Sequence, residues 1–257
     1  MSVNTYLQTL GSSLVLSENE KGSISTSVAN IKDKINSYFD DVEEILVFGS
    51  YGRNTILPRK ADEKSDVDMM IVFKNPNEYK PQSFLNRLKT FVEAKYTRSE
   101  IHQSSPTIVL ELNHIMFELT PAYIQYGMKY YIPDGPSNWM YSNPTKIANS
   151  ILECNKNNAY KIKPIVRLLK YWNVQKNSKG YKSYMIESKI ADNMKYSYFS
   201  CTSYTDYLLE ALKYINPYGY DSGANALKSN IEEALRLESI GCPCSAEDKI
   251  KGKFPPL

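Results

Sequence analysis

The sequence contains no long run of apolar residues. The longest uninterrupted apolar stretches in the 257 residues, such as Ile45 to Gly49 and Met69 to Phe73, are only five residues long. A membrane-spanning helix needs about 20, so the sequence predicts none. The first residues, Met1-Ser2-Val3-Asn4, have neither the basic region nor the apolar region of a signal peptide, and we expect no membrane association.

Cysteine and histidine are also scarce. The four cysteines show no disulfide framework, which is typical of a reducing compartment, so we expect a cytoplasmic location. Cys242-Pro243-Cys244 has the spacing of half a zinc site, but the chain has only two histidines and no further cysteine at ligand spacing. The sequence therefore favours ordinary thiols over structural zinc.

Neither sign of charge dominates the composition. The chain has 31 basic and 28 acidic residues and a formal net charge of +3, with 42% hydrophobic residues, which excludes collagen-like, disordered and histone-like chains. The balance hides a basic window from Lys156 to Lys189, in which nine basic residues accompany one acidic residue, Glu187. A compact polyanion such as a triphosphate suits this window, although a solvated helix face would also hold several lysines.

The spacing of apolar residues predicts an α+β protein. A capping box at Ser17 opens a long helix that ends at Phe39, and a shorter helix precedes it. Short strands are expected at 45–48 and 66–73, a helix from Pro81, and a hairpin over 107–120, whereas the pattern after Pro121 predicts helices, among them 162–172, 184–191, 204–214 and 224–237. We therefore predict a core over residues 1–125 and a helical lobe over 126–257, with the long helix bracing both and an active site in the cleft between them.

A phosphate-binding pattern precedes a pair of acidic residues. Gly49-Ser50 follows a predicted strand, and a helix is expected to start at Tyr51. Glycine lets an anion approach the backbone, and free amide groups at a helix start can hold it together with the Ser50 hydroxyl. Asp66 and Asp68 stand two residues apart in the next strand, so both side chains leave one face, about 6–7 Å apart at Cα. Two such carboxylates can share hard cations.

A third acidic residue is expected to complete a two-metal site. Glu118 lies in an otherwise apolar predicted strand, where a charge is costly unless a cation or another partner compensates it. Glu111, in a more polar strand, is the rival candidate. The alternative for Glu118 is a position on an exposed sheet face.

Gly49-Ser50, Asp66-x-Asp68 and Glu118 before Pro121-Ala122 resemble the motifs of DNA-polymerase-β-like nucleotidyltransferases. The downstream sequence resembles one branch of that superfamily, the cGAS/DncV-like bacterial nucleotidyltransferases (CD-NTases), to which oligoadenylate synthases and archaeal-type CCA-adding enzymes are more distantly related. This narrower resemblance is carried by Ile132-Pro133-Asp134, Trp139, Asn143-Pro144, Val166 to Asn173 and Lys182 to Glu187. One departure is Glu118, because Asp is more usual at the third acidic position.

The resemblance implies a role for each acidic residue. Asp66, Asp68 and Glu118 would be catalytic and would bind two Mg²⁺ ions, with Mn²⁺ as an alternative. Asp66 and Asp68 would hold both ions, and Glu118 the ion that activates the attacking hydroxyl.

The resemblance also implies a nucleotide-binding set. Lys170 and Ser183 would hold the donor triphosphate, and Tyr184 would stack on the donor base, with helix packing as the alternative for Tyr184. Arg167 joins the set because it shares a helix face with Lys163 and Lys170, with a structural ion pair as its alternative role. Gly49 and Ser50 complete the set.

The implied reaction is nucleotidyl transfer from a nucleoside triphosphate, with ATP expected, to the ribose hydroxyl of a second nucleotide, with release of pyrophosphate. The product would be a cyclic or short linear oligonucleotide messenger of bacterial anti-phage signalling. We expect a separate effector protein, because 257 residues leave little room beyond the two lobes.

Three rival functions use the same core. They are an RNA or tRNA 3′-end nucleotidyltransferase, a catalytically silent nucleotide sensor and, less favoured, a small-molecule nucleotidyltransferase. The first would need an extended basic surface, whereas the excess charge here is confined to one window and the sequence pI is ≈ 8.4. We therefore expect no strong nucleic-acid surface.

Overall fold

The computed structural model describes residues 1–75, 77–125, 127 and 129–257. The chain divides into two compact units: unit 1 comprises Met1–Val15, Asn54–Glu63 and Ile147–Leu257, and unit 2 comprises Leu16–Arg53 and Lys64–Lys146. This division does not follow the predicted boundary at residue 125. It assigns the N-terminal helix and a short inner segment to the same unit as the C-terminal helices.

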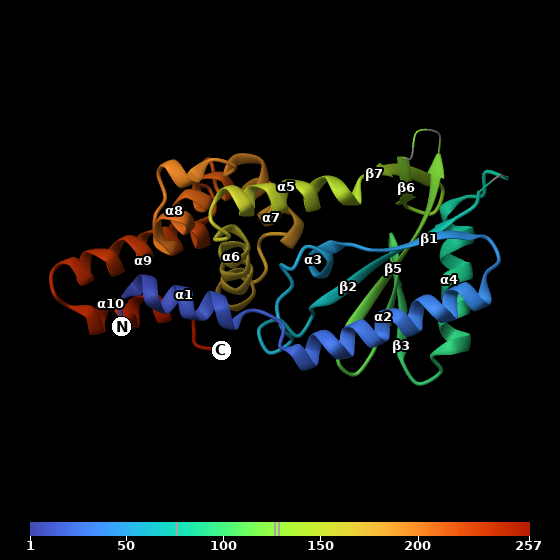
Figure 1. Ribbon diagram of the computed structural model, residues 1–257, viewed down its shortest axis with the longest axis horizontal. Helices are drawn as coiled ribbons and strands as arrows, with labels where there is room; N and C mark the ends of the chain where they lie inside the picture. Colours follow the sequence, from blue (N-terminus) through green and yellow to red (C-terminus); the bar gives the residue numbers. More distant parts are fainter. Residues whose placement is uncertain (76, 126, 128) are drawn as a thin grey trace. The chain divides into compact units, whose positions relative to one another are not determined.

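Unit 2 is built on a mixed β-sheet (Figure 1). Its main strand order is β1-β2-β5-β4-β3, and β6 pairs with β5 and with β7. The strands are β1 (Val42–Val47), β2 (Asp66–Phe73), β3 (Glu100–Ser104), β4 (Thr107–Glu111), β5 (Met116–Gln125), β6 (Lys129–Asp134) and β7 (Asn138–Ser142). β2 and β5 are parallel and the other pairs are antiparallel. The predicted hairpin over 107–120 is confirmed as β4 and β5.

Two helices cover one face of this sheet (Figure 1). They are α2 (Glu18–Tyr38) and α4 (Pro81–Lys95). The predicted capping box at the start of α2 is confirmed, because the Ser17 side chain accepts from the Glu20 amide and the Glu20 carboxylate accepts from the Ser17 amide. The rings of Phe73 and Phe84 join β2 to α4, with centroids 5.2 Å apart. Because side chains alternate along a strand, the even-numbered residues of β2 leave the opposite face.

The prediction that only helices follow Pro121 is wrong. β5 continues through Pro121 to Gln125, and β6 and β7 follow it as an antiparallel pair. Most side chains of β6 and β7 are only partly buried or exposed, and Pro133 lies within β6. Such partly exposed edge strands lack the apolar alternation by which strands are recognised in a sequence.

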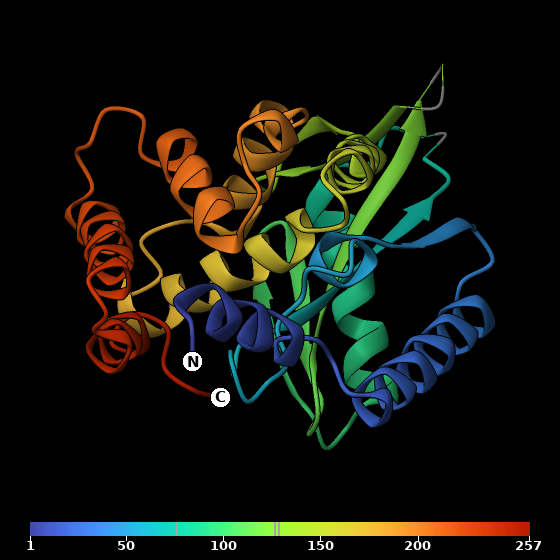
Figure 2. The same cartoon turned by 60° about the vertical axis from the view of Figure 1, so that its left-hand side comes forward.

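Unit 1 is helical. It contains α1 (Val3–Ser13), most of α5 (Pro144–Asn157), α6 (Ile162–Lys176), α7 (Ser183–Asn193), α8 (Tyr204–Ile215), α9 (Ser222–Ser239) and α10 (Pro243–Lys251), with a short 3₁₀ helix at Ser197–Phe199. α6 is central, since every residue from Ile165 to Asn173 is buried. Both chain termini lie near α1 (Figures 1 and 2), and the Tyr6 hydroxyl donates to the carbonyl oxygen of Phe254 at 2.5 Å.

No helix in the described part of the chain is long and apolar enough to cross a membrane. All four cysteines are free: Cys154 and Cys201 are buried, whereas Cys242 and Cys244 are exposed.

Candidate active site

The predicted acidic residues gather on the face of the unit 2 sheet that α2 and α4 leave open. β2 and β5 run side by side in parallel, with Asp68 in register with Glu118 and Asp66 in register with Met116. Paired residues on neighbouring strands point to the same face, and the strands lie about 4.8 Å apart. Glu111 pairs with Met116 from β4, one strand further from β2. The register therefore places Glu118, rather than Glu111, beside Asp68.

The apolar residues that follow on this face anchor the acidic end. Met70 and Val72 of β2 and Ala122 of β5 are buried in one cluster with partly buried side chains of β1, β5 and β6. The inner end of each strand is thereby packed, whereas Asp66, Asp68 and Glu118 remain only partly buried.

Gly49 brings the Gly-Ser motif against the acidic pair. It begins the single-turn helix α3 (Gly49–Gly52), which packs on β2, and the amide of the preceding Phe48 donates to the carbonyl oxygen of Asp68 at 3.0 Å. Gly49 has a φ of 63°, and a β-carbon there would overlap the Asp68 carboxylate. The sequence predicted a glycine that lets an anion approach the backbone; in the structure that anion-like neighbour is the side chain of Asp68.

The surroundings of Glu118 on this face disfavour the charged form of its carboxylate. Burial, followed by the nearby charge of Asp68, raises the pKa of Glu118, while His102 opposes the shift. His102 lies on the same face, two strands from β5, because it pairs with Val109 and Val109 pairs with Glu118. The position of His102 on this face was not predicted from the sequence, because strand β3 was not predicted.

Neighbouring carboxylates of this kind suit a hard divalent cation. The oxygen donors of Asp66, Asp68 and Glu118 are the type that Mg²⁺ and Mn²⁺ prefer. Within residues 1–75, 77–125, 127 and 129–257, no group of three or more His, Cys, Asp and Glu side chains converges as a preformed metal site. The donor chemistry therefore fits Mg²⁺, and Asp68 and Glu118 are the pair in register on neighbouring strands.

Lys170 lies in a buried polar cluster in unit 1. Its ammonium group forms an ion pair with Glu187 of α7 and donates to the carbonyl oxygen of Thr55 at 3.2 Å. The Thr55 hydroxyl also donates to Glu187, at 2.7 Å. Lys170 is 3% exposed, and Thr55 and Glu187 are fully buried. Glu187, the one acidic residue of the basic window, is thus the direct partner of Lys170. The spacing of residues in the sequence did not predict the contacts of Lys170 with Glu187 and Thr55.

Arg167 is buried one turn before Lys170. Its guanidinium donates through Nη1 to the carbonyl oxygen of Asn54 at 3.0 Å, whereas its buried Nε has no hydrogen-bond partner in the described part of the chain. Burial lowers the pKa of Arg167 to about 10, while Tyr204 opposes the shift. The structural ion pair considered as an alternative role for Arg167 is not found among the described residues.

Ser183 and Tyr184 occupy the first turn of α7. Both side chains are exposed, and Tyr184 is 61% exposed. Glu187 follows one turn later on the same helix. The pairing of Glu187 with Lys170 therefore fixes the helix end that presents Ser183 and Tyr184.

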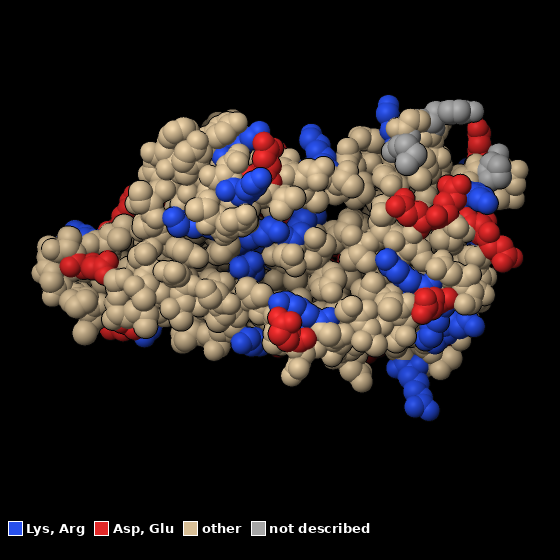
Figure 3. Space-filling model, in the orientation of Figure 1, with Lys and Arg blue, Asp and Glu red and all other residues tan. Residues whose placement is uncertain are grey.

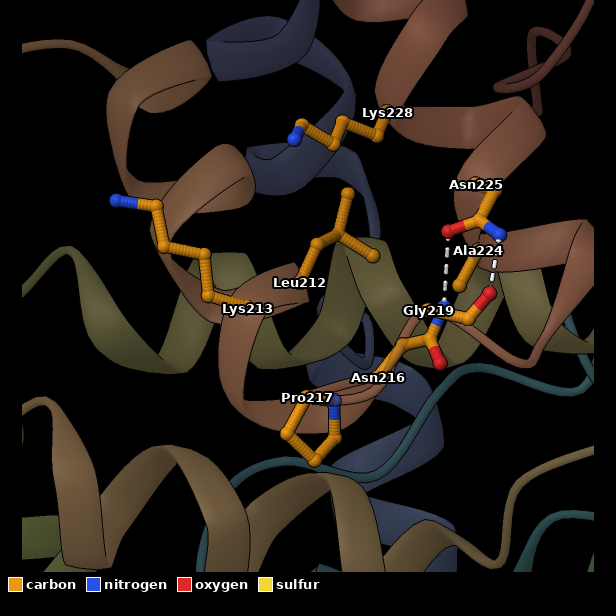
Figure 4. Close-up of a pocket in the computed structure, with 8 residues that line it drawn as sticks. All are labelled: Leu212, Lys213, Asn216, Pro217, Gly219, Ala224, Asn225 and Lys228. Atoms are coloured by element: carbon orange, nitrogen blue, oxygen red, sulfur yellow. Dashed lines mark hydrogen bonds between the residues drawn. The ribbon is translucent and has the colours of Figure 1, made fainter.

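A pocket of about 250 Å³ lies elsewhere in unit 1, at the turn between α8 and α9 (Figure 4). The Asn225 side chain closes this turn by accepting from Asn216 at 3.0 Å and donating to the Gly219 carbonyl oxygen at 2.6 Å. None of the predicted site residues lines the pocket.

The predicted residues fall into two sets: Gly49, Ser50, Asp66, Asp68 and Glu118 in unit 2, and Arg167, Lys170, Ser183 and Tyr184 in unit 1.

Sequence comparison identifies a family. Residues 1–155 match the model of the Second Messenger Oligonucleotide or Dinucleotide Synthetase domain (SMODS). A probable cyclic nucleotide synthase of Bacillus cereus (strain VD146) is 26% identical over 246 residues, covering 78% of this chain and 73% of that protein. A cyclic AMP-AMP-AMP synthase of Acinetobacter sp. (strain ATCC 27244 / 9458) is 26% identical over 189 residues, and the chain spans only 54% of that relative.

Solved structures share the fold. CdnG, a CD-NTase of Bradyrhizobium diazoefficiens in complex with GTP, matches with a TM-score of 0.74 at 12% identity, covering 96% of this chain and 93% of that one. CdnC of E. coli MS115-1 with ATP matches with a TM-score of 0.71 at 12% identity over 97% of both chains. DncV of Vibrio cholerae, a cyclic AMP-GMP synthase with a linear intermediate, has a TM-score of 0.64 at 13% identity and covers 97% of this chain and 80% of that one.

The predicted α+β architecture, a nucleotidyltransferase core sheet with a helical lobe, is confirmed by these matches. At such low identity the likeness establishes the fold, and the family rests on the model that covers more than half of the chain. The chain belongs to the SMODS family of CD-NTases, nucleotidyltransferases that make cyclic oligonucleotides from nucleoside triphosphates and release pyrophosphate.

Proposed function

We propose that this chain is a Mg²⁺-dependent synthase of a cyclic or short linear oligonucleotide second messenger, with ATP among its substrates. The observation that carries the proposal is the register of β2 and β5, which sets Glu118 beside Asp68 while Gly49 packs against the same Asp68 carboxylate. A catalytic face of this kind matches the chemistry of the family to which the chain belongs.

Asp66, Asp68 and Glu118 would hold the metal ions, with Mn²⁺ as an alternative to Mg²⁺. When bound, the metal would lower the pKa of an attacking ribose hydroxyl and neutralise charge on the triphosphate. Gly49 keeps the Asp68 carboxylate in place, because any larger residue would displace it. Ser50, at the start of α3, would donate its hydroxyl hydrogen to a phosphate oxygen.

The nucleotide would be held by the unit 1 residues that the family resemblance singles out. Ser183 is exposed at the start of α7, where its hydroxyl can donate to a phosphate oxygen, and the exposed ring of Tyr184 can stack on a base. Glu187 and Thr55 hold the Lys170 ammonium group in place. From that position Lys170 would hold the triphosphate. Arg167 adds a second fixed cation one turn earlier.

The messenger would act on a separate effector protein in anti-phage defence, in keeping with a family of second-messenger synthetases. A cytoplasmic location fits both the nucleotide substrates and the four free thiols. The Acinetobacter relative, a cyclic AMP-AMP-AMP synthase, makes ATP the first donor to test.

The experiment incubates the protein with an equimolar mixture of the four NTPs, with Mg²⁺, with Mn²⁺ or with EDTA. Pyrophosphate release and mass spectrometry of the products are the readouts. We expect metal-dependent pyrophosphate release and oligonucleotide products that resist phosphatase when cyclic. The double variant Asp66→Asn/Asp68→Asn should lose at least about a hundredfold in rate.

The matched control is Asp62→Asn, because Asp62 pairs with Lys179 and lies outside the sheet. It should keep its rate within about twofold. Full activity of the double Asn variant would contradict the metal assignment. Extension of an added RNA 3′ end in place of oligonucleotide synthesis would favour the RNA-tailing alternative, and ATP binding without turnover under any metal would favour a silent sensor.

A further inference from the structure

The loop between α6 and α7 leads directly to two residues of the proposed nucleotide site. It spans residues 177–182, and Ser183 and Tyr184 follow it in the first turn of α7. Within the described part of the chain, no side chain caps the start of α7. Helix ends without a cap tend to fray. The position of Ser183 and Tyr184 therefore depends on what holds the loop before them.

The loop has an unfavourable backbone. Ser178 and Lys179 both lie in the left-handed region, with φ values of 49° and 56°. Residues other than glycine keep this conformation only where their surroundings impose it. The loop therefore needs contacts that hold it closed.

Charge does not supply these contacts. Basic side chains gather on the surface over α6 and α7 (Figure 3), and three lysines lie in the loop or beside it: Lys176, Lys179 and Lys182. Like charges so close together favour an open loop over a tight one. Lys179 pairs with Asp62 at 2.8 Å, but an ion pair of an exposed lysine contributes little to stability.

Asn173 of α6 holds the loop by hydrogen bonds. Its side-chain oxygen accepts from the Tyr181 amide at 3.1 Å, and its side-chain nitrogen donates to the Tyr181 carbonyl oxygen at 2.8 Å. The Asn173 backbone carbonyl oxygen accepts from the Lys179 amide at 2.9 Å. Asn173 is only 4% exposed, so water cannot easily replace these bonds. One residue thereby fixes the backbone two positions before Ser183.

α9 supports the same loop. Asn177, the first loop residue, donates from its side chain to the Asn173 side-chain oxygen at 3.3 Å. A β-carbon at Gly223, in the first turn of α9, would overlap the side-chain oxygen of Asn177. The lack of a side chain at Gly223 therefore lets the loop pack closely against α9.

We propose that Asn173 is a positioning residue for nucleotide binding, because it fixes the loop whose end presents Ser183 and Tyr184. This inference rests on the proposed function, to which the roles of Ser183 and Tyr184 belong. Asn173 acts through the backbone of Tyr181, and both of its hydrogen bonds to Tyr181 require a primary amide. Asp would lack the donor, and Leu would lack both groups.

The test compares Asn173→Leu with Asn158→Leu. Asn158 is also a buried asparagine that holds a loop, since its side chain donates to the Cys154 and Met194 carbonyl oxygens at 2.8 and 3.0 Å. Both variants should lower the Tm, by about 2–10 °C. Calorimetry with Mg²⁺ and a non-hydrolysable ATP analogue should show about tenfold weaker binding for Asn173→Leu and less than about a twofold change for Asn158→Leu.

Steady-state kinetics should show the loss in Asn173→Leu as a higher KM for ATP with kcat within about threefold, because the altered contacts bind the nucleotide and do not perform the chemistry. Asn173→Asp keeps the shape and the acceptor but lacks the donor, and it replaces Asn173→Leu if the latter does not fold. Wild-type affinity in the folded variant would overturn the inference. So would an equal loss of affinity in Asn158→Leu, which would indicate a general effect of lower stability.

A further comparison tests whether Asn173 acts through the two site residues. In a Ser183→Ala/Tyr184→Ala background, in which binding is already weakened, adding Asn173→Leu should weaken binding by less than about twofold. A further tenfold loss would contradict a role that acts through Ser183 and Tyr184.

Hydrogen exchange of the wild-type protein requires no variant. The Tyr181 amide should exchange at least about a hundredfold more slowly than an unprotected amide, and fast exchange would contradict the role of Asn173. Failure of the proposed function is distinguishable. A wild-type protein that binds the analogue with an affinity dependent on Asn173 but makes no oligonucleotide would contradict the proposed function alone. Oligonucleotide synthesis by the wild type, with unchanged affinity in Asn173→Leu, would overturn only this inference.

Discussion

Among single residues, Gly49 constrains the acidic face most tightly. It combines a left-handed backbone with a side-chain neighbour that occupies the space of a β-carbon. The first feature disfavours any other residue by about 1 kcal/mol. The second would push the Asp68 carboxylate away from Glu118, with which it shares the sheet face.

We predict that Gly49→Ala lowers kcat about a hundredfold, because displacement of a catalytic group by about 1 Å can have this effect. Gly241→Ala is the matched control: Gly241 also has a positive φ, of 78°, but a β-carbon there would meet nothing within 4 Å. Gly241→Ala should lose about 1 kcal/mol of stability, and Gly49→Ala should lose at least as much because its β-carbon would also overlap the Asp68 carboxylate. Only Gly49→Ala should lose activity. Steady-state kinetics and urea unfolding give the two readouts; equal kcat values would disprove the proposed role of Gly49.

The four thiols should divide into two classes. Burial raises the pKa of Cys154 to about 12 and also raises the pKa of Cys201, whereas Cys242 and Cys244 are exposed. A raised pKa leaves less reactive thiolate at any pH below it. At pH 8 an aromatic disulfide reagent should therefore titrate two thiols quickly in the native protein and four after unfolding in guanidinium. Four fast thiols in the native protein would disagree with the buried positions.

At the scale of elements, the packing of α6 against α7 depends on a buried ion pair. Lys170 and Glu187 are joined across the two helices, and Thr55 bonds to both. A buried pair is strongly destabilising to break but close to neutral to replace as a whole. The pair therefore specifies which residues of α6 and α7 face each other, and so where the α7 end with Ser183 lies relative to α6.

A double-mutant cycle tests this pair. Glu187→Leu should lower the free energy of unfolding by about 3–5 kcal/mol because it leaves the Lys170 charge buried without its partner. The double variant Lys170→Met/Glu187→Leu should recover most of that loss. Breaking the more exposed pair of Lys179 with Asp62 by Lys179→Met should cost less than about 1 kcal/mol. Additive losses in the buried pair, measured by urea unfolding, would indicate that the two side chains do not act together.

The sequence predicted elements best where the apolar spacing was regular. The helix ending near Phe39, the β4–β5 hairpin and helices α6 to α9 were predicted close to their observed positions. β3, β6 and β7 were missed because their side chains are mostly exposed or partly buried, and a half-exposed strand has no clear period. α5 and α10 were missed as well, and both begin at a proline, Pro144 and Pro243.

The candidate site was predictable in its residue types but not in its pairings. Asp66 and Asp68 were placed on one face by strand alternation alone, whereas the register that sets Glu118 beside Asp68 is known only from the structure. The partners of Lys170 come from residues 115 and 17 positions away along the chain, and no spacing rule connects them. Formal charge likewise does not indicate that Arg167 and Lys170 are buried.

At the scale of the whole molecule, unit 1 is closed by its two ends. α1 packs on α6, α8 and α10, and Phe254 is fully buried beyond the end of α10. We predict that Phe254→Ala lowers the free energy of unfolding by about 3–5 kcal/mol, as large core truncations do. The neighbouring change Lys253→Ala should stay within about 0.5 kcal/mol. Urea unfolding gives both values, and a loss below about 1 kcal/mol for Phe254→Ala would contradict a closing role.

The discontinuous course of unit 1 has a consequence for synthesis. The apolar face of α1 and the segment Asn54–Glu63 leave the ribosome early, but the helices that bury them follow from Ile147 onward. At 5–20 residues per second, the roughly 130 residues from the end of α1 at Ser13 to Ile147 take about 7–27 s to be added. During that interval unit 2 can complete its sheet, whereas α1 must remain uncovered and available to chaperones. α1 is therefore made well before the helices that bury it.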